Sequence, residues 1–250
     1  MQTLKECVMV FAKAPAFGRV KTRLAAGIGE KAATSLYKAF VKDLLGMIDS
    51  TDYPIHIHFA PPDAGRQMKE WLGGAGEFYP QADGDLGDRM AAAFKHAFSK
   101  HVSRAVLIGT DFPDLPASFI HRAFDSLLTH DAVLGPSHDG GYFLIGFSRH
   151  GYVPEVFQDI SWSSDKVFSE TARAFEKHHT TVHYLDQWWD IDTYADLMEF
   201  IRRLKDTAGV AAPETKKLLY DLDLMQTDSD NTGESGTAYY GDIIMTPEKR

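Results

Sequence analysis

The chain has 250 residues, a formal net charge of −9, 44% hydrophobic residues and a single cysteine. This composition is typical of one large globular domain, with or without an appendage. The negative charge argues against a general nucleic-acid-binding protein, which needs an extended basic face. One cysteine excludes an internal disulfide and a cysteine-based zinc site.

Membrane and export signals are not evident in the sequence. No stretch approaches the roughly 18 consecutive apolar residues that a membrane span needs, and the N-terminus lacks the pattern of a signal peptide. We therefore expect a cytoplasmic protein with no membrane partner.

The first predicted element is a buried strand, Cys7–Ala12, because its continuous apolar run is typical of a strand covered on both faces. A loop over Lys13–Arg23 follows. Apolar residues then recur at three- and four-residue spacing over Ala33–Ile48, which predicts an amphipathic helix of about five turns. Ile55–Ala60 is predicted to be the second strand.

Further along the chain, predicted helices and strands continue to alternate. In order, we expect helices over 63–72 and 86–98, a strand over 105–109, a helix over 118–128, strands over 132–135 and 142–147, a helix over 167–175, a strand over 181–185 and a helix over 194–204. Such alternation indicates βαβ units and a mainly parallel sheet. The close strands 132–135 and 142–147 interrupt it, which favours one antiparallel element.

The pattern weakens after Gly209. Residues 206–250 hold nine acidic and four basic residues, and residues 227–237 have the composition of a linker or tail. We therefore predict a catalytic domain over residues 1–209 and an acidic extension over 210–250. Removing the extension should leave the fold nearly unchanged, unless a short helix over 213–222 docks on the body.

The most informative motif is KAPAFGRVKTRL, residues 13–24, hereafter the basic loop. Its four cations are Lys13, Arg19, Lys21 and Arg23. A loop after a parallel strand leaves the sheet edge where ligands bind, and lysine and arginine bind phosphate oxygens. Pro15 and Gly18 frame the loop for close approach of the backbone. The Walker phosphate-binding pattern is absent.

A second motif, GTDFPD, follows the strand over 105–109. Mg²⁺ or Mn²⁺ is commonly held by one or two carboxylates together with phosphate oxygens and water. Asp111 is the predicted ligand of such a cation. Asp114 either joins it or caps the next helix.

Two further motifs allow a structural and a functional interpretation. Ser137–Tyr142 (SHDGGY) is either a plain hairpin turn or a turn that faces substrate, which the second glycine and the flanking histidine and tyrosine suit equally well. In WWDIDT, Asp192 or Thr193 caps the following helix, or Asp192 is a second metal carboxylate.

Taken in order, KAPAFGRVKTRL, QADGDLGDRM, IGTDFPDLP, GPSHDGGYFLIG and DIDTYADL resemble a bacterial family of GT-A-like transferases. That family lies in the nucleotide-diphospho-sugar transferase superfamily, and its members include radical-SAM/selenodomain-associated transferases. It is similar to the phospholactate and molybdenum-cofactor guanylyltransferases. The resemblance covers roughly residues 5–205 and is more specific for the family than for the reaction.

The resemblance implies a Rossmann-like α/β/α sandwich of three layers with a mainly parallel sheet. It implies a nucleotide site formed by Lys13, Pro15, Gly18, Lys21, Arg23, Gly84, Asp85 and Arg89. Asp111 would bind the metal, Asp139 would face the second substrate, and Lys21 and Arg23 would offset charge as the bond to phosphate breaks.

Two reactions remain open at this point. In glycosyl transfer a nucleotide-sugar donor loses nucleoside diphosphate to a small acceptor, with Asp139 taking the acceptor's proton. In nucleotidyl transfer a nucleoside triphosphate reacts with a phosphorylated acceptor and pyrophosphate leaves. A nucleotide-binding protein without catalysis is a third interpretation, and a homodimer is an open assembly state.

Overall fold

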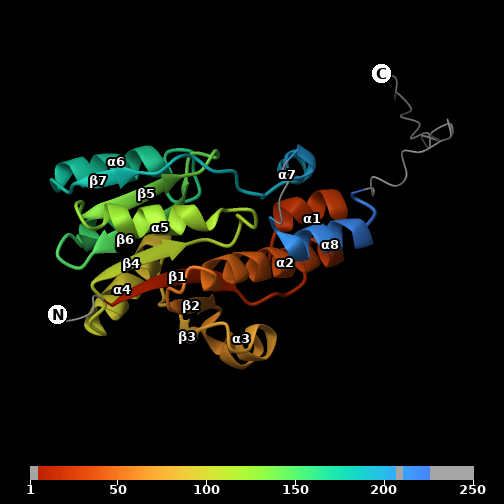
Figure 1. The fold of residues 1–250 in the computed structure, drawn as a ribbon, viewed down its shortest axis with the longest axis horizontal. Helices are drawn as coiled ribbons and strands as arrows, with labels where there is room; N and C mark the ends of the chain where they lie inside the picture. Colours follow the sequence, from red (N-terminus) through yellow and green to blue (C-terminus); the bar gives the residue numbers. More distant parts are fainter. Residues whose placement is uncertain (1–4, 207–210, 226–250) are drawn as a thin grey trace, which may run out of the picture.

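Figure 1 shows the computed structural model, which describes residues 5–206 and 211–225. Seven strands form one sheet in the order β3-β2-β1-β4-β6-β5-β7. The strands are β1 Glu6–Lys13, β2 Ile55–Ala60, β3 Glu77–Pro80, β4 Arg104–Ile108, β5 Ala132–Pro136, β6 Tyr142–Ser148 and β7 Val182–Tyr184. Neighbouring strands pair in parallel except that β6 is antiparallel to both β4 and β5. The predicted mainly parallel sheet with one antiparallel element is confirmed.

Eight α-helices pack around this sheet in the described part of the chain. They are α1 Thr22–Ile28, α2 Glu30–Asp49, α3 Gly65–Leu72, α4 Leu86–Ser99, α5 Ala117–Ser126, α6 Val167–Lys177, α7 Tyr194–Asp206 and α8 Pro213–Asp221. Short 3-10 turns lie at Pro62–Ala64 and Pro154–Phe157. Among the described residues, no helix combines the length and the apolar character needed to cross a bilayer.

Alternate residues of β1 build two different cores, because successive side chains of a strand point to opposite faces. Val8 and Val10 pack on the face covered by α2, α3 and α5. Cys7 and Met9 pack on the opposite face, against α4 and α6. The apolar run of β1 therefore reflects burial on both faces, and the predicted three-layer α/β/α sandwich is confirmed.

A third cluster of buried residues comes mainly from helices and lies at one end of the molecule, where α1, α2, α7 and α8 meet (Figure 1). Leu219 of α8 is fully buried in it beside Phe40 of α2. Asp43, which lies within α2, accepts hydrogen bonds from the first amides of α8. Part of the predicted extension is therefore packed on the body. The polar segment over 227–237 lies outside the described residues.

Two local features differ from the sequence expectations. The predicted helix over 33–48 begins earlier, and α1 precedes it with a break at Gly29, whose φ of 83° lies in the region that favours glycine. Strand β3 was not predicted, since this four-residue edge strand has only partly buried or exposed side chains.

Candidate active site

The carboxyl ends of β1 and β4 form a topological switch point of the sheet. From β1 the chain moves to β2 on one side and returns at β4 on the other. Loops that leave two such strands diverge and open a crevice, which is where open α/β sheets bind ligands. The basic loop follows β1 and the Asp111 loop follows β4, so the structure brings these two motifs together.

Lys21 lies at the centre of this crevice. Its Nζ is 2.7 Å from Asp111 Oδ1, 2.7 Å from Asp192 Oδ1 and 2.6 Å from the carbonyl oxygen of Ile191. The backbone N–H of Ile191 donates to the carbonyl of Asp111 at 3.1 Å, which joins the two carboxylate-bearing segments. Burial acts to lower the pKa of Lys21, but the two carboxylates hold it above its ordinary value. Lys21 is therefore a buried cation bound by two acids.

The backbone fixes the position of Lys21. The residue precedes α1 in the left-handed conformation, with φ 49° and ψ 44°, where few residues other than glycine are found. Val20 before it and Leu24 after it are both buried in the core. These anchors direct the lysine inward, and its side chain is only 4% exposed.

Asp192 is left to bind Lys21 because its neighbour caps α7. The hydroxyl of Thr193 accepts a hydrogen bond from the Asp196 backbone at 3.3 Å, and the Asp196 carboxylate accepts one from the Thr193 backbone at 2.7 Å. Of the two caps that the sequence left open, Thr193 is the one formed. The second oxygen of Asp192 lies 3.7 Å from Arg23, whose side chain is 71% exposed.

The carboxylates of Asp111 and Asp192 converge on one cation position, which the Lys21 ammonium holds. Two carboxylates completed by phosphate oxygens and water are a common donor set for Mg²⁺, so these residues fit such an ion. Across residues 5–206 and 211–225, no group of three or more His, Cys, Asp or Glu side chains could hold a metal. The remaining ligands of a bound ion would thus come from substrate and water.

Two pockets that share Lys13 lie beside the basic loop. One, of about 400 Å³, is lined by Lys13, Lys21, Arg23, Asp111 and Asp192 among others. The second, of about 600 Å³, also contains Lys13 and is lined by Arg19 and Arg89. Five cations thus surround two neighbouring pockets of an acidic chain, which suits a ligand with several phosphate charges.

Pro15 and Gly18 shape the basic loop without lining either pocket. Pro15 is buried, and its carbonyl accepts a hydrogen bond from the Gln67 side chain at 3.1 Å. Gly18 has a φ of 67°, and a Cβ added there would lie 3.2 Å from a carboxylate oxygen of Glu30. Both residues position the cations around them, and direct contact with a nucleotide stays a prediction.

Gly84, Asp85 and Arg89 lie at the start of α4 with different surroundings. Asp85 and Asp88 form a reciprocal cap, in which the Asp88 amide donates to Asp85 at 2.9 Å. Gly84 has a φ of 106°, and a Cβ there would lie 2.4 Å from Asp88 Oδ2. Arg89 Nε donates to the carbonyl of Gly84 at 3.0 Å and also lines the larger pocket. Arg89 is therefore the member of this group in position to meet a ligand.

Asp139 lies at the tip of the β5–β6 hairpin and is exposed. Its Oδ1 accepts hydrogen bonds from the Ser137 hydroxyl at 2.5 Å and from the Gly141 backbone at 2.9 Å. The motif is thus both a hairpin turn and an oriented carboxylate, and the structure does not select between the two interpretations. Gly140 is required here, because a Cβ would lie 2.3 Å from the carbonyl oxygen of Asp165.

Asp190 was missed by the sequence analysis. It is half-buried, and burial together with the charges of Asp139, Asp192 and Asp196 raises the pKa of its carboxyl to about 6. The signal available in the sequence was the spacing of three acids over 190–196, directly after two tryptophans. Asp190 links the Asp139 turn electrostatically with the Lys21 cluster.

Aromatic rings flank these acids. The rings of His138 and Trp189 are stacked with centroids 3.4 Å apart, and the Arg203 guanidinium lies 5.5 Å from the Trp189 centroid. Asp114 accepts hydrogen bonds from Trp188 at 3.1 Å and from Arg203 at 3.3 Å. Asp114 therefore supports this region and does not cap α5, which has no side-chain cap.

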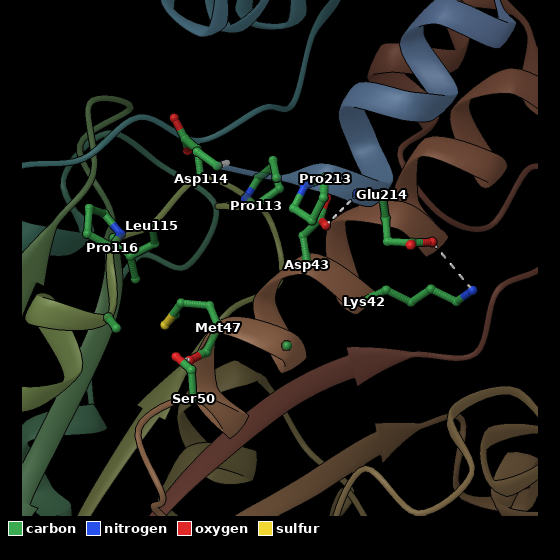
Figure 2. Close-up of a pocket in the computed structure, with 14 residues that line it drawn as sticks. Lys42, Asp43, Met47, Ser50, Pro113, Asp114, Leu115, Pro116, Pro213 and Glu214 are labelled. Atoms are coloured by element: carbon green, nitrogen blue, oxygen red, sulfur yellow. Dashed lines mark hydrogen bonds and ion pairs between the residues drawn. The ribbon is translucent and has the colours of Figure 1, made fainter. Parts of the chain in front are cut away.

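A separate pocket of about 780 Å³ lies between α2, residues 113–117 and the start of α8. Figure 2 shows Asp43 beside Pro213 and the ion pair of Lys42 with Glu214, whose charged atoms are 3.8 Å apart. Of the residues that the sequence analysis considered for the site, Asp114 lines this pocket, and its carboxylate binds Trp188 and Arg203. Lys42, Asp43 and Glu214 hold α8 against α2.

Comparison with known proteins places this geometry in context. A family model described as an uncharacterised protein conserved in bacteria, DUF2064, matches residues 45–164. The crystal structure of a candidate nucleotide-diphospho-sugar transferase from Desulfovibrio desulfuricans G20 is 36% identical to this chain, with a TM-score of 0.83. That match covers 89% of this chain and 96% of the other. Among curated proteins, none matches the chain significantly.

More distant structures share the fold alone. A CMP:2-keto-3-deoxy-manno-octonic acid synthetase in complex with CTP has a TM-score of 0.52 and 10% identity, covering 81% of this chain and 98% of the other. A cytidylyltransferase from Leptospira borgpetersenii has a TM-score of 0.54 and 11% identity, covering 95% and 100%. These similarities support the α/β fold described above.

Proposed function

Because this chain belongs to the nucleotide-diphospho-sugar transferase family and is thus a transferase, we propose that it moves a glycosyl group from a nucleoside diphosphate sugar to a small acceptor, aided by Mg²⁺ or Mn²⁺. One observation carries this proposal. Lys21, Asp111 and Asp192 meet in a pocket lined by cations, which shares Lys13 with a second such pocket, at the edge of the sheet where ligands bind.

The donor's phosphates bind in the pockets around Lys13. Lys13 and Arg23 face the smaller pocket, whereas Arg19 and Arg89 face the larger one. Arginine offers a planar fork to two phosphate oxygens, and lysine acts as a point charge. The diphosphate lies near Lys21 and Asp111, and the nucleoside extends into the larger pocket.

Asp111 and Asp192 would hold the divalent ion together with phosphate oxygens. When bound, such an ion withdraws charge from the leaving diphosphate and fixes its orientation. Lys21 and Arg23 add positive charge beside the same phosphate as the sugar–phosphate bond breaks. This chemistry depends on positioning and charge stabilisation, so no nucleophilic side chain is required.

Asp139 serves the acceptor. Its Oδ1 is held by Ser137 and Gly141, and among the described residues its Oδ2 has no hydrogen-bond partner. As the acceptor oxygen bonds to the sugar, its proton passes to this carboxylate, while the nucleoside diphosphate leaves with the electrons of the broken bond. The stacked His138 and Trp189 offer an aromatic surface beside Asp139 for a sugar-like or planar acceptor.

Nucleotidyl transfer is the second candidate, favoured by the extra cations of the larger pocket. Arg19 and Arg89 would accommodate a third phosphate beyond the two near Lys21. In that reaction a phosphate of the acceptor attacks the nucleotide, and pyrophosphate leaves. The leaving group separates the two candidates.

A ligand panel followed by product analysis tests the proposal. Unfolding temperatures are measured with UDP-, GDP-, ADP- and dTDP-glucose and with CTP and GTP, each with and without Mg²⁺ or Mn²⁺. A ligand at 100 times its dissociation constant stabilises the protein by about 2.7 kcal/mol. Release of nucleoside diphosphate from the hit supports glycosyl transfer, whereas pyrophosphate release supports the second candidate.

Asp111→Asn should lose the metal-dependent part of this stabilisation, and the exposed Asp63→Asn should keep it. An equal metal-dependent shift in Asp111→Asn would exclude Asp111 as a ligand. Absence of stabilisation by every nucleotide in the parent protein would refute the proposed donor class.

A further inference from the structure

Three oxygen atoms hold the Lys21 ammonium in this structure. It donates hydrogen bonds to the Ile191 carbonyl at 2.6 Å and to Asp192 at 2.7 Å, and its Nζ forms an ion pair with Asp111 Oδ1 at 2.7 Å. An ammonium group has three donors, and these contacts direct Lys21 toward the protein's own oxygen atoms. Its proposed role toward the donor therefore requires that at least one of these bonds is exchanged.

The same ammonium occupies the cation position between the two carboxylates. A divalent ion bound by both carboxylates would need oxygen ligands at roughly 2.0–2.1 Å if it were Mg²⁺. Lys21 Nζ already lies 2.7 Å from one oxygen of each carboxylate. Because like charges repel strongly in a partly buried site, the ion and the ammonium cannot share this position.

The two partners differ in their access to solvent. The Lys21 side chain is 4% exposed, whereas those of Asp111 and Asp192 are 36% and 34% exposed. An incoming ion or phosphate therefore reaches the carboxylates from the pocket side, while the lysine lies beneath them. The pocket also contains Lys13 and Arg23, which draw an anion to the same place.

Building on the proposed function, we propose that Lys21 is a resident cation that yields its place to a divalent ion only when the phosphates of the donor arrive. The phosphate oxygens then accept hydrogen bonds from the Lys21 ammonium, and the carboxylates of Asp111 and Asp192 bind the ion instead of the lysine. Metal and nucleotide then bind together, and metal alone binds weakly. The exchange keeps the carboxylate pair neutralised both with and without substrate.

Binding of Mn²⁺ alone tests this exchange, because electron paramagnetic resonance counts free Mn²⁺ directly. Lys21→Met keeps an unbranched side chain of nearly the same length and removes its charge. We expect Lys21→Met to bind Mn²⁺ without nucleotide at least tenfold more tightly than the parent. The double variant Lys21→Met/Asp111→Asn should lose this gain, which locates the ion at the carboxylate pair. Equal Mn²⁺ affinity of Lys21→Met and the parent would overturn the proposal.

A second measurement uses the parent protein, so it does not require that Lys21→Met folds. The ¹⁵N resonance of a buried, hydrogen-bonded lysine ammonium is observable by NMR because its protons exchange slowly. Mg²⁺ alone should leave the Lys21 signal unchanged, whereas Mg²⁺ with the nucleotide found in the panel should shift it. A shift caused by Mg²⁺ alone, or an unchanged signal in the full complex, would contradict the exchange. If no nucleotide binds at all, the proposed function fails, and the Mn²⁺ experiment still decides whether Lys21 excludes the ion.

Discussion

Asp43 in α2 binds Thr215 in α8 through one carboxylate oxygen, which accepts hydrogen bonds from the Thr215 hydroxyl at 2.5 Å and from its backbone N–H at 2.8 Å. The other oxygen accepts the Glu214 backbone N–H at 2.8 Å. The first amides of a helix have no partner within the helix. An acid from a distant helix therefore supplies the N-terminal cap that α8 lacks within its own sequence.

Replacement of this cap should weaken the fold. Asp43→Ala removes three hydrogen bonds to a charged group and leaves two amides of α8 without a partner. We expect a loss of about 2 kcal/mol in unfolding free energy, measured by urea denaturation. Asp49→Ala, at the exposed end of the same helix, should change it by less than about 0.5 kcal/mol. Equal effects of both substitutions would show that the cap contributes nothing.

The C-terminal boundary gives a second prediction, which revises the expectation from sequence. A chain ending at residue 209 loses Leu219 and Met225, which are buried against α1, α2 and α7. Burying one such side chain contributes about 1.5–3 kcal/mol, so we expect this truncation to destabilise the protein by roughly 3 kcal/mol or more. A chain ending at Met225 keeps every described contact and should unfold with the parent. The unfolding temperatures of the two truncated chains test this prediction. Equal unfolding temperatures would contradict it.

Acid should destabilise the fold through His58. Burial, followed by the charges of His56 and His96, lowers the pKa of His58 to about 3, and its Nε2 has no hydrogen-bond partner among the residues that the structure describes. The folded state disfavours the charged ring. His58 therefore does not lower the unfolding free energy above the unfolded pKa of about 6.5, where the ring is neutral in both states, and it lowers that free energy increasingly as the pH falls below this value. We expect His58 to account for a loss of about 2 kcal/mol between pH 7 and pH 5.

Urea denaturation across this pH range checks the assignment. His58→Leu should flatten the dependence, although His56, whose pKa burial also lowers, leaves part of it. His150→Gln, at an exposed position, should retain the full dependence of the parent. A parental slope in His58→Leu would assign the acid sensitivity to other groups.

Arg23 separates binding from folding. Its exposed side chain forms a 3.7 Å ion pair with Asp192, and exposed ion pairs contribute little, so Arg23→Lys should change unfolding free energy by under about 0.5 kcal/mol. The substitution keeps the charge but loses the planar fork. We expect calorimetry to show at least about tenfold weaker binding of the nucleotide donor, or roughly 1.4 kcal/mol. Exposed Arg66→Lys, far along the chain in α3, is the matched control, and equal affinities would make Arg23 an ordinary surface residue.

Much of the fold could be predicted from the sequence because the hydrophobic pattern of each element matches the way that element packs. The run from Cys7 to Ala12 predicted a strand buried on both faces, and its alternate residues do pack into two cores. Strand β3 escaped prediction because an edge strand needs little burial, so its side chains carry no strong pattern. The sequence left the docking of α8 open, because the cue was a single acid, Asp43, among the apolar residues of α2. Only the three-dimensional fold shows what that acid binds.

The candidate site was predictable as a set of motifs but not as a set of contacts. Lys21, Asp111 and Asp192 were each identified for separate roles toward phosphate or metal. Spacing along the chain could not show that these side chains neutralise one another, since they come from loops after β1 and β4 and from the segment before α7. Asp85 shows the converse, because a residue expected at the nucleotide also serves as the cap of α4.

The antiparallel course of β6 has a consequence for how this family can diversify. It closes a hairpin whose tip, residues 137–141, reaches the ligand edge of the sheet without belonging to the loops after β1 and β4. If Asp139 faces the acceptor as proposed, a change in the length or composition of that tip would alter which molecule receives the transferred group, while the residues proposed to bind the nucleotide stay unchanged. Exchanging residues 137–141 between members of this family would thus change the acceptor specificity without changing the rest of the fold.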